Sequence, residues 1–364
     1  EVERYITQVA FSGAEEFLQK YGEDASEAAG IIGHFGLGFY SSFMVSDTVE
    51  IQTLSFQPDA KPVHWTSSGE DSYEIEDGER TEHGTTIIMN ITEGEEEFLQ
   101  ESRIREILNK YCQFMPYEIY LNPHDEQRPV YDKDGNVEKN EDGTDKMRTV
   151  KPLPVNDTQP LWLKSPSECT DEEYQKVFMD FNEPLFWIHL NVDYPFNLKG
   201  ILYFPKQVNR LEVVPGQVKL YSNQVFVADN IKEVIPEFLL LLKGVIDCPD
   251  MPLNVSRSFL QNDGQVQKIA QHITKKVSDK LHQIFKNDRE TYEKYWNDIS
   301  AFIKFGCLKD EKFCDKMSDY ILFKDLDGKY LTLKDCIEKA EAAKAPAEGT
   351  EEAASVNSGE TKAE

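Results

Sequence analysis

The stretch Gly33-His34-Phe35-Gly36-Leu37-Gly38-Phe39-Tyr40-Ser41-Ser42-Phe43 places three glycines directly before an apolar segment with helical character. Because glycine has no Cβ, the backbone of such a loop can approach a ligand closely. Free N–H groups at the start of the following helix, together with the helix dipole, attract negative charge. The stretch therefore predicts a phosphate-binding loop that leads into a helix.

The spacing of the glycines excludes two common phosphate loops. A P-loop ends in Gly-Lys-Ser/Thr, and a dinucleotide fingerprint reads Gly-x-Gly-x-x-Gly after a strand. This loop instead reads Gly-x-x-Gly-x-Gly after a helix-like segment. A tight turn between two helices, with Gly30 or Gly33 as a C-cap, is the structural alternative. The glycines alone do not decide between a ligand loop and such a turn.

The wider segment supports the ligand loop. Residues 5–43, with Val45-Ser46-Asp47-Thr48-Val49 behind them, resemble the ATP domain of the heat-shock protein 90 chaperones, and most closely the bacterial HtpG type. The resemblance implies that ATP is bound by Gly33, His34, Phe35, Gly36, Leu37, Gly38 and Phe39.

Two later motifs follow in the order of this family. His83-Gly84-Thr85-Thr86-Ile87-Ile88 resembles the motif whose threonine approaches the adenine end of the pocket, which implies that role for Thr85; an ordinary turn before a strand is the alternative. The segment 254–261 resembles the middle-domain loop that sends an arginine to the γ-phosphate, which implies a catalytic Arg257 with Gln261 close by. The fixed charge and forked donors of arginine suit a transferring phosphoryl group, although most lone arginines are surface residues.

The resemblance covers roughly residues 1–340 and implies an α+β chain. Its first part would be a partial ATP-binding α/β sandwich of the gyrase, heat-shock chaperone, histidine kinase and mismatch-repair type, followed by an α/β middle domain with a helical connector. The expected segments are the C-terminal part of the N-terminal ATP-binding domain (1–122), a linker (123–156), the large α/β part of the middle domain (157–286), the helical connector with the start of a small α/β subdomain (287–340), and a disordered acidic tail (341–364).

Hydrophobic periodicity and turn residues predict the individual elements. The expected helices are an opening one with Val2, Tyr5, Ile6, Val9 and Ala10 on its apolar face, 97–114, one with an apolar stripe from Val266 to Ile284, and 292–305. The expected strands are 49–53, 85–91, 186–192, 199–203, 218–227 and a pair within 320–333. Asp134-Gly135 and Asp142-Gly143 predict hairpin turns within the linker.

Part of the family's nucleotide pocket has no counterpart in this sequence. The family anchors ATP with a helix that carries a catalytic glutamate and a magnesium-binding asparagine, and then with an Asp-x-Gly-x-Gly turn. The nearest candidates, Asp132-Lys133-Asp134-Gly135 and Asp325-Leu326-Asp327-Gly328, lie too far along the chain. We interpret the sequence as a fragment that holds half of the pocket, without the family's C-terminal dimerisation domain. The implied cofactors are ATP and Mg²⁺, with the magnesium ligand outside this sequence.

Composition limits the partners and the compartment. A formal net charge of −27 opposes binding to nucleic acid or to anionic membranes. No apolar run approaches the roughly 18 residues of a membrane span. The six cysteines contain no Cys-x-x-Cys pair, so neither a zinc site nor a redox motif is indicated, and we expect reduced thiols in the cytoplasm.

The resemblance implies an ATP-dependent chaperone for the intact parent, a homodimeric clamp that closes on ATP and binds non-native client proteins. Phe181 stands where relatives present a client-contacting aromatic, although tryptophan is more usual there and a buried core residue is equally consistent. A DNA-acting or phosphorelay ATPase of the same superfamily is one alternative, which the acidity and the middle-domain match oppose. A non-catalytic client-binding module is the other, and for this chain alone we expect it, with no ATPase activity.

Overall fold

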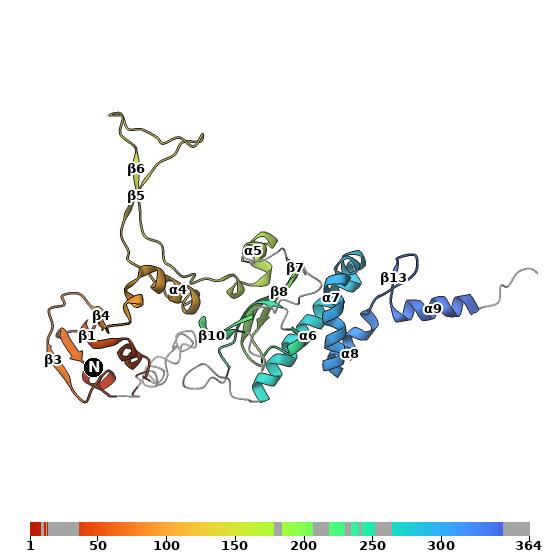
Figure 1. The fold of residues 1–364 in the computed structure, drawn as a ribbon, viewed down its shortest axis with the longest axis horizontal. Helices are drawn as coiled ribbons and strands as arrows, with labels where there is room; N and C mark the ends of the chain where they lie inside the picture. The colour runs from red at the N-terminus through yellow and green to blue at the C-terminus, as the bar shows by residue number, and fades with distance from the viewer. Residues whose placement is uncertain are drawn as a thin grey trace, which may run out of the picture. The chain divides into compact units, whose positions relative to one another are not determined.

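The computed structural model describes residues 1–8, 11, 13, 36–177, 184–206, 218–229, 234–239, 242–251 and 264–344 (Figure 1). The chain divides into two compact units: residues 1–236 with 240–270, and residues 237–239 with 271–364. Strands and helices both contribute, which confirms a mixed α+β chain. None of the described helices is both long enough and apolar enough to cross a membrane.

The first sheet contains β1 (Ser46–Leu54), β2 (Val63–Ser67), β3 (Tyr73–Asp77) and β4 (Gly84–Ile91), in the order β3-β2-β1-β4 with antiparallel neighbours. The strands predicted at 49–53 and 85–91 are thus confirmed. Because side chains alternate between the two faces of a strand, one face gathers apolar residues and the other gathers polar ones. The apolar face centres on Val49, Ile51 and Trp65, which are 0%, 2% and 3% exposed.

The helices around the glycine loop are shorter than predicted. α1 (Val2–Tyr5) ends before Ile6, and Val9 and Ala10 lie outside the described residues. The segment after the loop forms a 3-10 helix, η1 (Phe39–Met44), rather than an α-helix. The predicted helix 97–114 is also wrong as a single element, because extended backbone at Gln100 separates the 3-10 helix η2 (Glu96–Leu99) from α4 (Glu101–Tyr111).

The segment predicted as a linker contains an ordered two-stranded ribbon. β5 (Glu126–Pro129) pairs with β6 (Met147–Val150), and the ribbon runs away from α4 (Figure 1). Isolated bridges flank both predicted turns, Tyr131 to Val137 and Lys139 to Asp145. Both turn glycines have positive φ angles, which confirms the turns at Asp134-Gly135 and Asp142-Gly143.

The second sheet contains β7 (Pro184–Val192), β8 (Leu198–Pro205), β9 (Val218–Ser222), β10 (Val225–Asp229) and β11 (Lys243–Asp247), in the order β10-β9-β11-β8-β7. Only the pair β9 and β11 is parallel among the described pairs of this sheet. The single strand predicted at 218–227 is wrong, because Asn223 and Gln224 both have positive φ angles and turn the chain into a hairpin. Short elements precede the sheet: η3 (Leu161–Leu163), η4 (Pro166–Glu168) and α5 (Asp171–Val177).

The second unit is mainly helical. It contains η5 (Glu237–Leu239), α6 (Gly264–Asn287) from Gln271 onward, α7 (Arg289–Lys309), α8 (Glu311–Met317), η6 (Ser318–Tyr320), β12 (Phe323–Lys324), β13 (Tyr330–Leu331) and α9 (Leu333–Lys344). The predicted apolar stripe of α6 is confirmed, with Val266, Ile269, Ile273, Val277 and Leu281 all buried. The helix predicted at 292–305 lies within α7, and β12 and β13 form the predicted strand pair.

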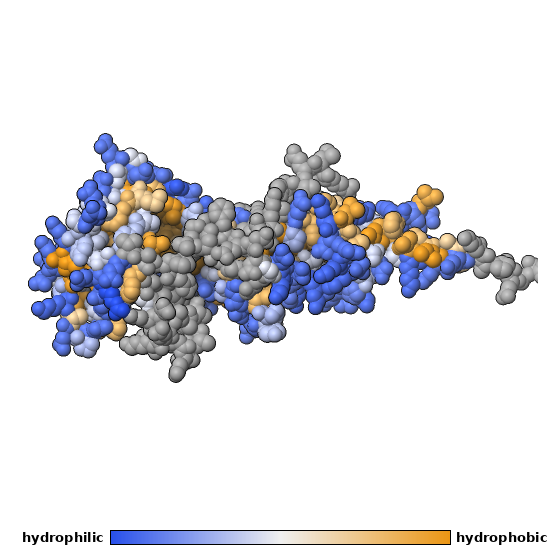
Figure 2. Space-filling model, turned by 90° about the horizontal axis from the view of Figure 1, so that it is seen from below, coloured by the Kyte–Doolittle hydropathy of each residue, from blue (hydrophilic) through white to orange (hydrophobic). Residues whose placement is uncertain are grey.

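Hydrophilic residues cover most of the described surface in Figure 2, and apolar groups form scattered patches between them. This distribution fits a chain with 66 acidic and 39 basic residues.

Candidate functional site

The structure describes the second half of the glycine loop. Gly33, His34 and Phe35 lie outside the described residues, whereas Gly36, Leu37, Gly38 and Phe39 lie within them. Gly36 has a φ of +64°, and a Cβ at this position would lie 2.3 Å from the carbonyl oxygen of Phe11. The fold itself therefore requires glycine at position 36, whatever the loop binds.

At position 38, by contrast, no described contact requires glycine. Its φ of −60° suits any residue, and a Cβ there would meet no described atom within 4 Å. The amides of Tyr40 and Ser41 donate to the carbonyls of Leu37 and Gly38, at 3.2 and 3.3 Å, whereas the amides of Gly38 and Phe39 donate to no described acceptor. Among the described residues, position 38 thus combines space for a ligand with two backbone donors that have no described acceptor, and an anion site requires both.

Aromatic packing fixes this loop on the first sheet. The ring of Phe39 packs edge to face on Trp65 of β2, with 5.7 Å between the ring centroids. The Tyr40 hydroxyl donates to the carbonyl of Ile6, and partial burial raises the pKa of Tyr40. The loop therefore lies against the apolar face of the sheet, from which the Trp65 side chain projects.

Thr85 projects from the same face. Its hydroxyl lies 2.7 Å from the hydroxyl of Thr53, its direct partner on β1. On β1, Ile51 is two residues from Thr53 and pairs with Trp65, so Thr85 and Trp65 share one side of the sheet. The structure thus brings the glycine loop and the predicted adenine-side threonine to one face. Gly84 has a φ of +134° at the strand start, so the alternative of an ordinary turn also stays open.

The remaining predicted residues lie outside the described part of the chain. These are Arg257 and Gln261 of the predicted arginine loop and Phe181 of the predicted client-contacting segment. The described chain stops at Met251, after β11, and resumes at Gly264 with α6. Their roles remain predictions from the sequence.

Sequence reasoning missed a junction that Gln224 forms between the segment after α4 and the second sheet. The Gln224 side-chain amide donates to the carbonyl of Phe114 at 2.7 Å, and its backbone amide donates to Asp247 Oδ2 at 2.9 Å. The Phe114 ring packs on Trp162, with centroids 4.4 Å apart. Burial raises the pKa of Asp247 to about 6, although the hydrogen bond from the Gln224 backbone amide lowers this pKa. The available sequence signal was the short polar run Ser222-Asn223-Gln224, which interrupts the apolar pattern and contains the turn-forming residue asparagine.

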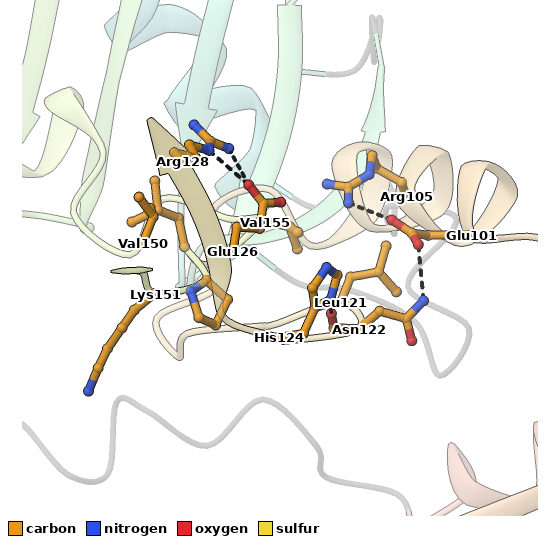
Figure 3. Close-up of a pocket in the computed structure, with 12 residues that line it drawn as sticks. Glu101, Arg105, Leu121, Asn122, His124, Glu126, Arg128, Val150, Lys151 and Val155 are labelled. Carbon is orange, nitrogen blue, oxygen red and sulfur yellow. Dashed lines mark hydrogen bonds and ion pairs between the residues drawn. The ribbon is translucent and has the colours of Figure 1, made fainter. Parts of the chain in front are cut away.

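A polar pocket of about 320 Å³ lies at the foot of the β5–β6 ribbon (Figure 3). Arg105 pairs with Glu101 at 2.8 Å, and Arg128 pairs with Glu126 at 2.6 Å. The Asn122 amide also donates to Glu101. Because both guanidinium groups already have carboxylate partners, and those carboxylates repel phosphate, this pocket is a poor alternative to the glycine loop as a phosphate site.

The described residues offer no ready magnesium site. Across residues 1–8, 36–177 and the later described ranges, no three His, Cys, Asp or Glu side chains gather as metal ligands.

Comparison with known proteins identifies the family. Residues 97–345 match the sequence model of the family described as Hsp90 protein. The chaperone protein htpG of Bacteroides fragilis (strain YCH46) is 49% identical over 339 residues, which cover 92% of this chain and 47% of the relative. The chaperone protein HtpG of Porphyromonas gingivalis (strain ATCC 33277) is 48% identical over 332 residues, covering 90% of this chain and 46% of the relative. This chain belongs to the Hsp90 protein family.

The similarity is to the bacterial HtpG type, as the sequence motifs indicated. A more distant relative, the chaperone protein HtpG of Geobacter metallireducens, is 32% identical and covers 94% of this chain and 54% of its own length. The chain spans about half the length of the curated relatives it matches.

Proposed function

We propose that this chain is part of an ATP-dependent molecular chaperone that binds and remodels non-native client proteins. The observation that carries the proposal is the shared sheet face, on which the glycine loop packs through Phe39 and from which Thr85 projects. The names of the relatives, which are chaperone proteins, support the same reading.

In this proposal the loop residues 33–39 bind the phosphates of ATP. The backbone amides at Gly38 and Phe39 donate to phosphate oxygens, and the missing side chain at Gly38 leaves room for them. Thr85 offers its hydroxyl at the adenine end. Arg257 stabilises the charge that develops on the γ-phosphate, with Gln261 beside it.

The chemistry is coupled to a movement of domains. We propose that ATP binding closes the loop over the phosphates and docks the ATP-binding domain (1–122) on the middle domain (157–286), and that hydrolysis reopens this clamp. Turnover coupled to domain closure is slow, because the conformational change limits the rate. The working form is a homodimer in the cytoplasm, without nucleic acid or membrane partners. Residues 123–156 link the ATP-binding domain to the middle domain, and residues 287–340 form the helical connector after the middle domain.

Substitution of Gly38 tests the nucleotide site. In the protein that also carries the upstream part of the ATP domain, Gly38→Val should weaken ATP binding at least about tenfold, because the side chain fills the space left for phosphate. The fold should persist, since nothing described contacts a Cβ at this position. Met44→Val is the matched control, because Met44 is 80% exposed at the other end of η1. Equal ATP affinity in Gly38→Val and the parent would reject the proposed site.

A non-catalytic holding function is the second candidate for this chain alone. It is favoured by the missing Asp-x-Gly-x-Gly turn, which would read adenine. Suppression of aggregation of a heat-denatured test protein, with and without ATP, distinguishes the two functions. Suppression of aggregation that is independent of ATP indicates a holding function. Suppression that differs with and without ATP indicates that the chain itself binds nucleotide.

A further inference from the structure

Two threonine hydroxyls meet where β1 pairs with the start of β4. Thr53 and Thr85 are direct partners in the antiparallel ladder, and their Oγ1 atoms lie 2.7 Å apart. The Thr53 hydroxyl also donates to the carbonyl oxygen of Gly84, at 3.2 Å. A single hydroxyl of β1 therefore contacts two oxygen atoms of β4.

Counting donors assigns the protons of these contacts. A threonine hydroxyl carries one proton and can accept as well as donate, whereas the Gly84 carbonyl can only accept. If Thr53 donates to Gly84, the Thr85 hydroxyl donates to Thr53 Oγ1 and both contacts are hydrogen bonds. If Thr53 donates to Thr85 instead, the contact with Gly84 has no proton and one hydrogen bond is lost. The first arrangement is therefore the more stable one.

This arrangement makes the Thr85 oxygen an acceptor toward any ligand. Its only proton is held by Thr53 Oγ1, and Thr85 is exposed in the described structure. A ligand group that meets the Thr85 oxygen must therefore donate a hydrogen bond. The 6-amino group of adenine is a donor, whereas the 6-oxo group of guanine or hypoxanthine is an acceptor.

We propose that Thr53 is a positioning residue for the adenine end of the nucleotide site. It holds the proton of Thr85, so the Thr85 oxygen accepts a hydrogen bond from the 6-amino group of ATP and disfavours a 6-oxo purine. Thr53 acts through Thr85 and does not itself touch the base. This inference rests on the proposed function, because it takes Thr85 as the adenine-side residue.

The affinities for ATP and for inosine triphosphate test the inference. Inosine triphosphate keeps the ribose and the triphosphate but carries a 6-oxo group and a proton on N1. Both are titrated into the protein that also carries the upstream part of the ATP domain. Thr53→Val keeps the shape of the side chain but releases the Thr85 proton, which then turns toward the base. We expect the preference for ATP over inosine triphosphate to fall about tenfold, the effect of one exchanged hydrogen bond.

Two further variants of β1 are the controls. Thr53→Ser retains the hydroxyl and should keep the preference of the parent. Thr48→Val changes a residue that is half-buried like Thr53 but lies on the opposite face, because it is adjacent to Val49 of the apolar face. Thr48→Val should leave both affinities unchanged. A merely structural role of Thr53 would weaken the binding of both nucleotides equally and leave their ratio unchanged.

A double variant tests whether Thr53 acts through Thr85. Thr85→Val alone should also lower the preference for ATP, and Thr53→Val added to it should lower the preference no further, since the two residues share one interaction. Thr53→Ala removes the same hydroxyl and decides the question if Thr53→Val does not fold.

The outcomes separate this inference from the function on which it rests. An unchanged ratio of affinities in Thr53→Val, or equal further losses when Thr85→Val is added, would overturn the role of Thr53 while ATP binding persists. Absence of ATP binding by the longer protein itself would reject the proposed function.

Discussion

The two sheets of the first unit differ in how completely they are covered. In the second sheet, β8 is buried along most of its length, with Leu198, Ile201 and Leu202 at most 1% exposed. In the first sheet, Ile87 and Met89 of β4 are 54% and 44% exposed, although they share the apolar face of the buried Val49 and Ile51.

This difference shows that the apolar side chains on a sheet face are buried only where another layer of the structure covers them. Among the described residues, η1 covers the centre of the first sheet through Phe39 and Trp65, and the apolar side chains of its outer strands stay exposed. The second sheet packs with Phe114, Trp162 and Tyr174. In our proposal, the open side of the first sheet is also the side on which the nucleotide site is completed.

The largest effect is expected where the second sheet is most tightly packed. Gly244 has a φ of +140°, and a Cβ there would lie 2.0 Å from the carbonyl oxygen of Ile201 on β8. Gly244→Ala should therefore destabilise the second sheet by on the order of 4 kcal/mol, measured by urea unfolding followed through tryptophan fluorescence. Gly264→Ala, at a position with free space, should leave the midpoint nearly unchanged. Equal midpoints for the two variants would contradict the described packing.

Matched truncations compare the two sheets directly. Leu202→Ala should cost about 2–5 kcal/mol, because a fully buried side chain leaves a cavity. Ile87→Ala should cost less than about 1 kcal/mol, because more than half of that side chain is already exposed. The same unfolding assay measures both, and a cost for Ile87→Ala equal to that for Leu202→Ala would show that the first sheet is covered.

Asp247 gives the second sheet a pH dependence. Burial raises its pKa from the usual 3.8 to about 6 in the folded state, so between these values the folded state binds more protons than the unfolded one. Stability should therefore fall by roughly 3 kcal/mol in total as the pH rises from below about 3 to above about 7, with about 2 kcal/mol of the decrease between pH 4 and pH 6.

Two substitutions assign this pH dependence to Asp247. Asp247→Asn should remove most of the decrease, whereas Asp229→Asn, at an exposed position on the neighbouring hairpin, should retain it. Urea unfolding at a series of pH values measures the effect. A slope that survives in Asp247→Asn would contradict the assignment.

The smallest effect concerns catalysis by this chain alone. We expect ATP hydrolysis at background rate, because in our proposal this sequence supplies only part of the nucleotide site. Arg257→Ala should then leave the phosphate release rate unchanged. Measurable turnover that Arg257→Ala abolishes would show that the chain holds a complete site.

Local patterns predicted the elements with strong periodicity but not those that depend on single backbone angles. The stripe of α6 and the strands β1, β4, β7 and β8 followed from their apolar spacing. The hairpin of β9 and β10 was not predicted. The polar run Ser222-Asn223-Gln224 interrupts the apolar pattern only briefly, and it holds no glycine to indicate the positive φ angles of Asn223 and Gln224. The break at Gln100 was missed for the same reason, since glutamine is a common helix residue.

The candidate site could likewise be predicted only in part from the sequence. The motifs pointed to the glycine loop and to Thr85, but they could not separate the role of Gly36, which the fold requires, from that of Gly38, which it does not. That distinction depends on the backbone of Phe11, which is distant in sequence.

Calorimetric titration of ATP with magnesium tests the central claim most directly. It is carried out on this chain and, beside it, on the same protein with the upstream part of the ATP domain. We predict no heat of binding for this chain and saturable binding for the longer protein, because in our proposal the loop at residues 33–39 supplies only part of the nucleotide site. Saturable binding by this chain alone would contradict the account, and so would the absence of binding by the longer protein.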